Sequence, residues 1–278
     1  MKIYFVFSDS YKDLLQEAGV RILLNYNAAA RSNLGGVIPS GFKSVLVDSG
    51  VFQLQTGTRA AHEVTIDGYC TWLKQQLPYH PEVDGYMAFD WDGGKGTTVE
   101  RVATIRRNYL YMQEQGLNPL PVWHPTREVL QDLDFYAKQT DYIAMGGVAS
   151  TGRFTMAIPI VASMRMRYPD HKFHILGLGH SILNKLSVEL RPHSVDISTW
   201  NVPARFGNTI EKRPDGTLVE QHMLRDERRD GKRVSVEALK GGLSNVFLRD
   251  SLKRSIEVLM SLEDDTRVGT APIQPILL

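Results

Sequence analysis

Short apolar runs recur along the chain, and each ends in a polar or glycine-marked turn that a helical pattern follows. Apolar runs of about four to eight residues that are bounded in this way are typical of buried strands. The pattern predicts eight strands, at residues 3–7, 22–26, 44–48, 86–90, 120–124, 142–146, 173–177 and 194–198.

Amphipathic stretches rich in helix-forming residues lie between most of these strands. Thr97 before Glu100, and Thr126 before Glu128, fit the chemistry of a helix N-cap, and Gly116 suits a helix C-terminus. The clearest predicted helices are 98–116, 126–139 and 153–168.

Strands that alternate with helices are joined by crossovers and therefore lie parallel. Eight such units within about 250 residues predict an α/β fold, a single-domain (β/α)8 TIM barrel over residues 1–278. A doubly wound open sheet is the alternative, because the number of strands does not by itself show closure.

The pattern changes at about residue 208. Residues 208–235 are predicted to form a charged insertion, which begins with a hairpin over 209–221 around the turn Pro214-Asp215-Gly216. A last helix over 235–264, interrupted at Gly241-Gly242, follows the insertion.

Composition limits the function classes. The 278 residues are 42% hydrophobic, which allows a sizeable core, and 32 basic against 31 acidic residues argue against nucleic-acid binding by bulk charge. The single cysteine, Cys70, excludes an internal disulfide and a cysteine-based zinc site. No run of 18 apolar residues and no signal-peptide pattern is present, so we expect a cytoplasmic protein without a membrane partner.

Candidate chemistry gathers at the strand ends. In a (β/α)8 barrel the carboxyl ends of the strands and the following loops form the active site. A lone aspartate there is more often a cap or turn residue, but three at equivalent positions favour a shared site. The residues at or next to the predicted strand ends are Asp48, Asp90, His124, Gly146, Gly147, Gly177 and Asp196.

Five segments resemble the tRNA-guanine transglycosylases, which are (β/α)8 barrels. Residues 48–53, DSGVFQ, are similar to the DSGGFQ motif of that family, and residues 196–207 keep its aspartate, Ala204-Arg205 and Gly207 at the same spacing. The other three segments, in the family's order, are MAFDWD (87–92), MGGVA (145–149) and ILGLGHSILNKL (175–186).

The resemblance implies exchange of a guanine base for a 7-deazaguanine without cutting of the strand. It makes Asp196 the nucleophile at the sugar C1′ and Asp48 the general acid/base. Cleavage of a glycosidic bond develops positive charge on the sugar, which a nearby carboxylate stabilises and captures. One covalent intermediate is sufficient for the exchange, so no cofactor is expected.

The resemblance also implies a binding site for the base. Asp90 would accept hydrogen bonds from the N1–H and the exocyclic amine of guanine, and Phe52 would stack on the ring. The Gly146-Gly147 turn would bring a backbone donor, from Gly147, near the base carbonyl. His124 stands where the family has a glutamine that faces this carbonyl.

The chain also departs from the family. Its single cysteine cannot form the family's zinc site, Val51 replaces a motif glycine, and residues 200–202 differ in the nucleophile loop. These departures resemble the compact phage and bacterial branch that inserts 7-deazaguanines such as preQ0 into DNA. DNA with a flipped-out base is therefore the expected partner, in the host cytoplasm if the protein is phage-encoded, and tRNA is the alternative.

Basic residues late in the chain are candidates for phosphate contacts. Arg205 would anchor a phosphate or the nucleophile loop, with a surface salt bridge as the alternative. A solvated charged loop is the alternative for the other candidates, because acidic residues are interspersed among them. These candidates are Arg225, Arg228, Arg229, Lys232 and Arg233.

Two other classes of function remain open at this point. One is a non-catalytic subunit of a transglycosylase complex, although such a subunit has no need of a nucleophile. The other is a metal-dependent hydrolase with His124, His174 and Asp196 as ligands. No H-x-H or HExxH spacing supports the second class, and no metal is expected.

Overall fold

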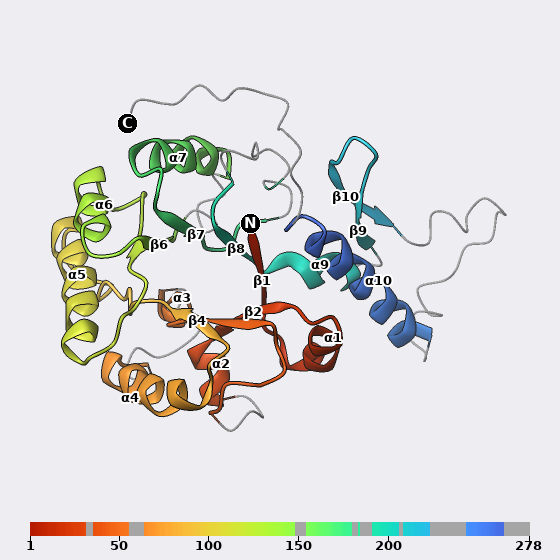
Figure 1. Cartoon of the computed structure of the whole chain (residues 1–278), viewed down its shortest axis with the longest axis horizontal. Helices are drawn as coiled ribbons and strands as arrows, with labels where there is room; N and C mark the ends of the chain where they lie inside the picture. The colour runs from red at the N-terminus through yellow and green to blue at the C-terminus, as the bar shows by residue number, and fades with distance from the viewer. Residues whose placement is uncertain are drawn as a thin grey trace.

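The computed structural model shows an α/β protein built on one strongly curled sheet of eight parallel strands (Figure 1). The structure describes residues 1–31, 36–55, 64–147, 154–179, 183, 191–205, 208–222 and 243–263. The strands are β1 (Lys2–Val6), β2 (Arg21–Asn25), β3 (Ser44–Asp48), β4 (Val83–Tyr86), β5 (Val122–Trp123), β6 (Tyr142–Met145), β7 (Lys172–Ile175) and β8 (Ser194–Ile197). All eight predicted strands are present, with ends shifted by a few residues.

The strands follow the order β4-β3-β2-β1-β8-β7-β6-β5, so the sheet curls back toward its own first edge. Helices surround the strands in Figure 1, and α4 to α7 follow one another around the outside of the curl. Within the described ranges, no helix is both long and apolar enough to cross a membrane. The helices are α1 (Lys12–Glu17), α2 (Tyr26–Arg31), α3 (Val51–Gln55), α4 (Ile66–Gln76), α5 (Thr98–Glu114), α6 (Leu130–Ala137), α7 (Phe154–Arg167), α9 (Val202–Arg205) and α10 (Leu243–Met260), with short 3-10 turns η1 (Asp9–Tyr11), η3 (Leu77–Tyr79) and η6 (Thr199–Asn201).

The edge strands β4 and β5 meet at one point instead of along a ladder. Met87 and Leu120 form an isolated parallel bridge, in which Leu120 donates to the Tyr86 carbonyl at 2.8 Å and accepts from the Ala88 N–H at 2.7 Å. The sheet is therefore barrel-like but not closed by a regular ladder, so the predicted closed barrel is confirmed only in part.

Apolar side chains cover both faces of the sheet, because successive residues of a strand point to opposite sides. Ile3, Phe5 and Ile22 belong to the large core under the helices. A smaller cluster consists of Tyr4, Leu23, Leu46, Met87, Leu120, Val122 and Ala144. Both clusters explain why the strands form nearly continuous apolar runs in the sequence.

The two predicted helix caps have different outcomes. Thr97 caps α5 as expected: its Oγ1 accepts the Glu100 N–H at 3.3 Å, and Glu100 Oε2 accepts the Thr97 N–H at 2.7 Å. The cap at Thr126 is wrong, because α6 begins only at Leu130. The Glu128 carboxylate instead accepts the backbone N–H of His124 at 2.6 Å. Glu128 is therefore buried behind a candidate site residue.

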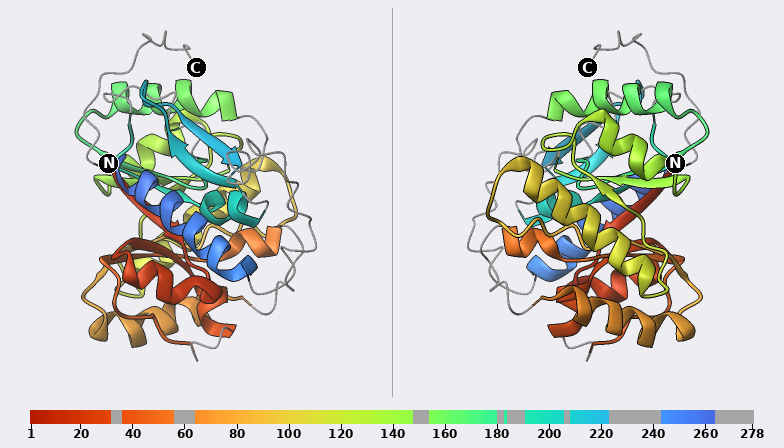
Figure 2. Two further views of the ribbon diagram at one scale, coloured as in Figure 1. Left: turned by 90° about the vertical axis from the view of Figure 1, so that its right-hand side faces the viewer. Right: turned by 90° about the vertical axis from the view of Figure 1, so that its left-hand side faces the viewer.

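The predicted hairpin is confirmed as the antiparallel pair β9 (Asn208–Lys212) and β10 (Leu218–His222). It lies beside α10, and the two elements are visible together in Figure 2. Ser255 Oγ accepts the Ile210 N–H at 3.0 Å, and Ser251 Oγ donates to the Asn208 carbonyl at 2.6 Å. The rest of the predicted insertion, with the interruption at Gly241-Gly242, lies outside the described residues.

Glu263, just after α10, connects the end of the described chain to its beginning. Its Oε1 accepts the Ile3 N–H at 2.9 Å, and both carboxylate oxygens pair with Arg21. The amino terminus of Met1 donates to the Glu263 carbonyl at 3.4 Å. These contacts hold α10 to the amino-terminal ends of β1 and β2, away from the strand ends that carry the aspartates.

We expect Glu263→Ala to lower the free energy of unfolding by about 1.5–3 kcal/mol, because it leaves a half-buried guanidinium and a strand N–H without their acceptor. Urea unfolding measures the change. Glu257→Ala, at an exposed position of α10, is the matched control and should stay within about 0.5 kcal/mol of the parent. Equal losses in the two variants would contradict this role for Glu263.

Candidate active site

Three aspartates converge at the carboxyl-terminal side of the sheet. Asp48 is the last residue of β3, Asp90 follows β4, and Asp196 lies in β8. Burial, together with the nearby charges of Asp90 and Asp196, raises the pKa of the Asp48 carboxyl to about 7. Because each neighbour affects Asp48, the structure brings together the three carboxylates that the strand ends predicted.

Asp48 is held by groups from the adjacent strand and turn. Asn25 is its register partner in β2, and Asn25 Nδ2 donates to Asp48 Oδ2 at 2.9 Å. The Gly50 N–H also donates to Asp48, and both bonds lower its pKa without outweighing burial. Gly50 has a φ of +80°, and a Cβ there would come within 2.7 Å of Asn25 Oδ1. The motif glycine is thus required by its conformation and by the close approach of Asn25.

Asp90 is bound through both of its carboxylate oxygens. Ser49 Oγ donates to Oδ1 at 3.1 Å, and His124 Nε2 lies 2.9 Å from Oδ2. All three side chains are buried. A carboxylate only accepts, so the imidazole presents an N–H to it. Asp90 and His124 therefore form one unit, which neighbours Asp48 through the adjacent residue Ser49.

His124 is fixed against the glycine turn after β6. A Cβ on Gly146 would lie 2.7 Å from His124 Cε1, and one on Gly147 would lie 3.3 Å from Nδ1. Among the described residues, the buried Nδ1 of His124 has no hydrogen-bond partner. The Gly146 N–H is bound to the Trp123 carbonyl at 2.9 Å. Gly146 thus gives space to the imidazole, and its own N–H is engaged in the sheet.

Glu128 binds the backbone of His124 and so supports the pair of Asp90 and His124. The pKa of its carboxyl is raised to about 7, because the effect of burial outweighs the opposite effect of the hydrogen bond from the His124 backbone. Tyr136 Oη donates to the other carboxylate oxygen at 3.3 Å. The sequence pattern assigned Glu128 to a helix cap, and no local signal indicated a buried carboxyl beneath His124.

Asp196 is buried, with 3% of its surface exposed. The Gly177 N–H donates to its Oδ1 at 2.8 Å, and His174 Nε2 lies 3.3 Å from the same oxygen. Gly177 was predicted from its turn, and His174 was considered only as a metal ligand. A signal for His174 does exist in the sequence: it is a polar residue inside an apolar strand, three residues before Gly177 of the glycine turn.

Asp92 differs from Asp90, although both lie in one short segment. Arg101 and Arg127 donate to Asp92 Oδ2, at 2.5 and 2.7 Å, and the Gly94 N–H donates to Oδ1 at 2.9 Å. Burial alone would raise the pKa of Asp92, but these bonds lower it. Asp92 is therefore a paired structural carboxylate, which organises the loop before α5.

The other predicted residues are exposed or lie outside the described chain. Phe52, on α3 just after β3, is 56% exposed, and Arg205 is exposed at the end of α9. Trp200, in the segment 200–202 that differs from the family's nucleophile loop, is fully buried; its indole N–H donates to the Val6 carbonyl at 3.0 Å, and its ring packs edge-on against Tyr11. The residues outside the described chain are Arg225, Arg228, Arg229, Lys232 and Arg233.

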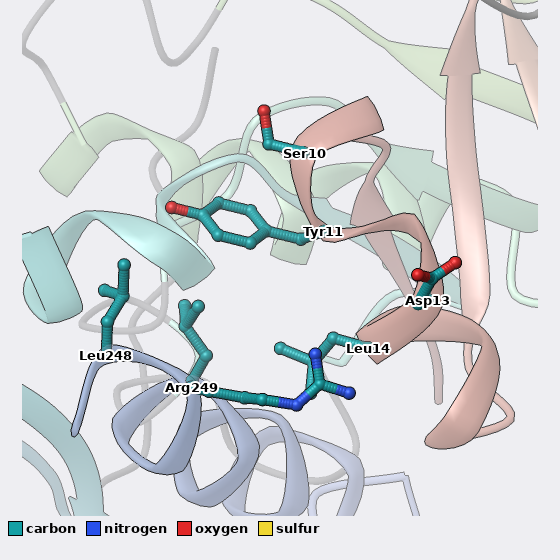
Figure 3. A pocket seen from close by; sticks show the side chains of 7 residues that line it. Ser10, Tyr11, Asp13, Leu14, Leu248 and Arg249 are labelled. Atoms are coloured by element: carbon teal, nitrogen blue, oxygen red, sulfur yellow. The ribbon is translucent and has the colours of Figure 1, made fainter. Parts of the chain in front are cut away.

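A cavity of about 270 Å³ lies between η1, α1 and α10 (Figure 3). None of its lining residues belongs to the aspartate group. Tyr11 and Leu14 face the α10 side chains across it, and Arg249 pairs with Glu17 nearby at 2.5 Å. The lining residues are Ser10, Tyr11, Asp13, Leu14, Leu248, Arg249 and Leu252.

The part of the chain that the structure describes contains no set of ligands for a metal ion. No three His, Cys, Asp or Glu side chains gather there in a way that could hold a metal ion. His124 and His174 are each bound to a different aspartate, Asp90 and Asp196. The metal-dependent hydrolase therefore receives no support from this geometry.

The fold and the site define an α/β protein with a carboxylate group at the carboxyl-terminal side of a curled parallel sheet. No protein-family model matches the chain. The chain is similar to Uncharacterized protein 306 of Sulfolobus islandicus rod-shaped virus 1, with 30% identity over 168 residues. The match covers 58% of this chain and 50% of the viral protein, so the chain spans about half the length of this relative.

We expect Asp48→Asn to stabilise the protein at pH 8 by roughly 1–3 kcal/mol, with little effect at pH 4. The pKa of Asp48 is about 7 when folded, against a usual 3.8. The folded state therefore binds this proton more tightly, and the parent loses stability as the pH rises through that window. Urea unfolding at several pH values measures the difference.

Asp250→Asn, at an exposed position of α10, is the control for the loss of one charge. Glu128 titrates in the same window, but it is present in both proteins and cancels from the comparison. A difference between Asp48→Asn and the parent that stays constant from pH 4 to pH 8 would contradict the raised pKa of Asp48.

Proposed function

We propose that the protein is a base-exchanging transglycosylase, which replaces guanine in DNA with a 7-deazaguanine such as preQ0. The observation that carries the proposal is the convergence of three aspartates in three different environments. Glycosidic exchange requires one carboxylate for the sugar and a second group that holds a proton near neutral pH. Asp196 and Asp48 suit these two tasks.

Asp196 is the nucleophile in this proposal. Its carboxylate accepts hydrogen bonds on Oδ1, which hold it in place for attack on C1′. Attack forms the Asp196–C1′ bond as the C1′–N9 bond to guanine breaks. The entering base then attacks C1′ and releases the carboxylate, so the two inversions together retain the configuration at C1′.

Asp48 transfers the proton. With a pKa of about 7, a large share of the carboxyl is protonated at neutral pH and protonates the departing guanine. The resulting carboxylate then accepts the proton that the entering 7-deazaguanine loses from N9. The proton balance closes over one exchange, so no cofactor and no energy source are needed.

Asp90 recognises the base in this proposal, and His124 holds its carboxylate. A carboxylate oxygen can accept two hydrogen bonds, so the one bond to each Asp90 oxygen, from Ser49 or His124, leaves lone pairs for the N1–H and the exocyclic amine of guanine. The exposed ring of Phe52 suits stacking, which tolerates the change at position 7. In this proposal the backbone of Gly147 donates a hydrogen bond to the base carbonyl.

The single-domain (β/α)8 barrel belongs to the same proposal, supported by the bridge between Met87 and Leu120. DNA is favoured over tRNA because a chain with one cysteine cannot form the zinc site of the tRNA-modifying enzymes. A non-catalytic subunit is disfavoured because all three aspartates lie together.

Incubation with radiolabelled guanine tests the substrate directly. Duplex DNA and tRNA are offered separately, and the label that precipitates with each polymer is counted. We expect DNA to become labelled and tRNA to stay unlabelled. Label in tRNA alone would replace DNA with tRNA as the substrate, and no label in either polymer, with guanine or with labelled preQ0, would overturn the proposal.

We expect Asp196→Asn to abolish incorporation of label, because an amide neither captures nor stabilises the sugar cation. The parent should also form a protein–DNA adduct that survives a denaturing gel, and the variant should not. Asp170→Asn, at an exposed position, should match the parent in both assays. An Asp196→Asn protein that keeps its exchange activity shows that the nucleophile is another group.

We expect Asp90→Asn to raise the KM for guanine by roughly 10- to 150-fold, because charge-assisted hydrogen bonds to the base are lost. Hypoxanthine lacks the exocyclic amine, so the parent should prefer guanine and the variant should discriminate less. Competition between the two bases measures this preference, with Asp170→Asn as the control. Unchanged discrimination would remove Asp90 from base recognition.

A further inference from the structure

A continuous row of polar side chains crosses the interior of the sheet behind Asp196. Tyr142 Oη lies 2.7 Å from Ser194 Oγ, which lies 2.7 Å from His174 Nδ1. His174 Nε2 lies 3.3 Å from Asp196 Oδ1. The row runs through the neighbouring strands β6, β7 and β8. Its residues Ser194, His174 and Asp196 are buried.

The chemistry of these groups fixes the direction of the row. A carboxylate only accepts hydrogen bonds, so His174 Nε2 carries the proton that faces Asp196. In the neutral imidazole, Nδ1 then accepts from the Ser194 hydroxyl. Tyr142 in turn donates to Ser194, so each bond polarises the next toward the carboxylate.

Both donors to Asp196 act on the same oxygen. The Gly177 N–H and His174 Nε2 reach Oδ1, and no group in the described part of the chain is found bonded to Oδ2. The planar carboxylate is held at one oxygen from two directions, which limits its rotation. Among the residues that the structure describes, Oδ2 therefore keeps its lone pairs for another atom.

We propose that His174 is the positioning residue of the nucleophile, which holds Asp196 by Oδ1 so that Oδ2 is the attacking oxygen. The inference rests on the proposed function of Asp196. Ser194 fixes the ring of His174, and Tyr142 fixes Ser194. Preorganisation of this kind acts on the bond-forming step and leaves substrate binding unchanged.

A graded series of variants tests the proposal in single-turnover formation of the protein–DNA adduct. His174→Leu removes the donor and should slow adduct formation by about 10- to 100-fold, with the KM for DNA within about twofold of the parent. His174→Gln keeps an N–H at a similar reach and should recover most of the rate. Ser194→Ala should show a smaller loss than His174→Leu, and Tyr142→Phe the smallest.

Urea unfolding of every variant separates positioning from folding, because a structural role predicts rate losses that follow the losses of stability. Equal rates for His174→Leu and the parent, a change in KM alone, or no recovery in His174→Gln would each overturn the proposal. Because leucine at this buried position can impair folding, His174→Gln and Ser194→Ala repeat the test with smaller changes.

Nitrogen-15 NMR of the histidines gives a readout that needs no activity. We expect the His174 signal, assigned by its loss in His174→Gln, to show a proton on Nε2. An unprotonated Nε2 would overturn the inference even in an active enzyme. If the parent neither exchanges bases nor forms an adduct, the proposed function fails, and the NMR result still decides whether His174 donates to Asp196.

Discussion

Three carboxyl groups buried at one side of a single sheet repel one another, and the local structure is arranged around that repulsion. Burial and the charges of Asp90 and Asp196 together raise the pKa of Asp48. Each aspartate is compensated by its own donors: Asn25 for Asp48, His124 for Asp90, and Gly177 for Asp196. Removal of a donor would leave a buried charge that costs several kcal/mol, so these partners are as much a part of the site as the aspartates.

The sheet separates the groups that stabilise the fold from the groups that form the site. Parallel strands bring their carboxyl ends to one side, where the loops carry polar residues. At the opposite ends, Glu263 binds the first two strands and holds α10 in place. Apolar layers on both faces of the sheet lie between these regions, so residues of the site can be unfavourable for stability without loss of the fold.

Neighbouring carboxylates take different roles because their surroundings differ. Asp90 and Asp92 are separated by one residue, yet Asp90 binds His124 while Asp92 is neutralised by Arg101 and Arg127. The hydrogen bonds lower the pKa of Asp92, whereas burial raises the pKa of Asp48. The same type of side chain therefore holds a proton near pH 7 at Asp48 and forms a structural ion pair at Asp92.

The sequence by itself determined the strands, the helix α5 with its cap, the hairpin and the three strand-end aspartates. These features depend on local patterns: apolar runs, turn glycines and capping residues act within a few positions of the chain. Only the tertiary structure decided that Asn25 lies beside Asp48, that His174 binds Asp196, and that β4 and β5 meet at a single bridge. These outcomes depend on which strands are neighbours and on their register, and contacts between residues far apart in sequence leave no local pattern.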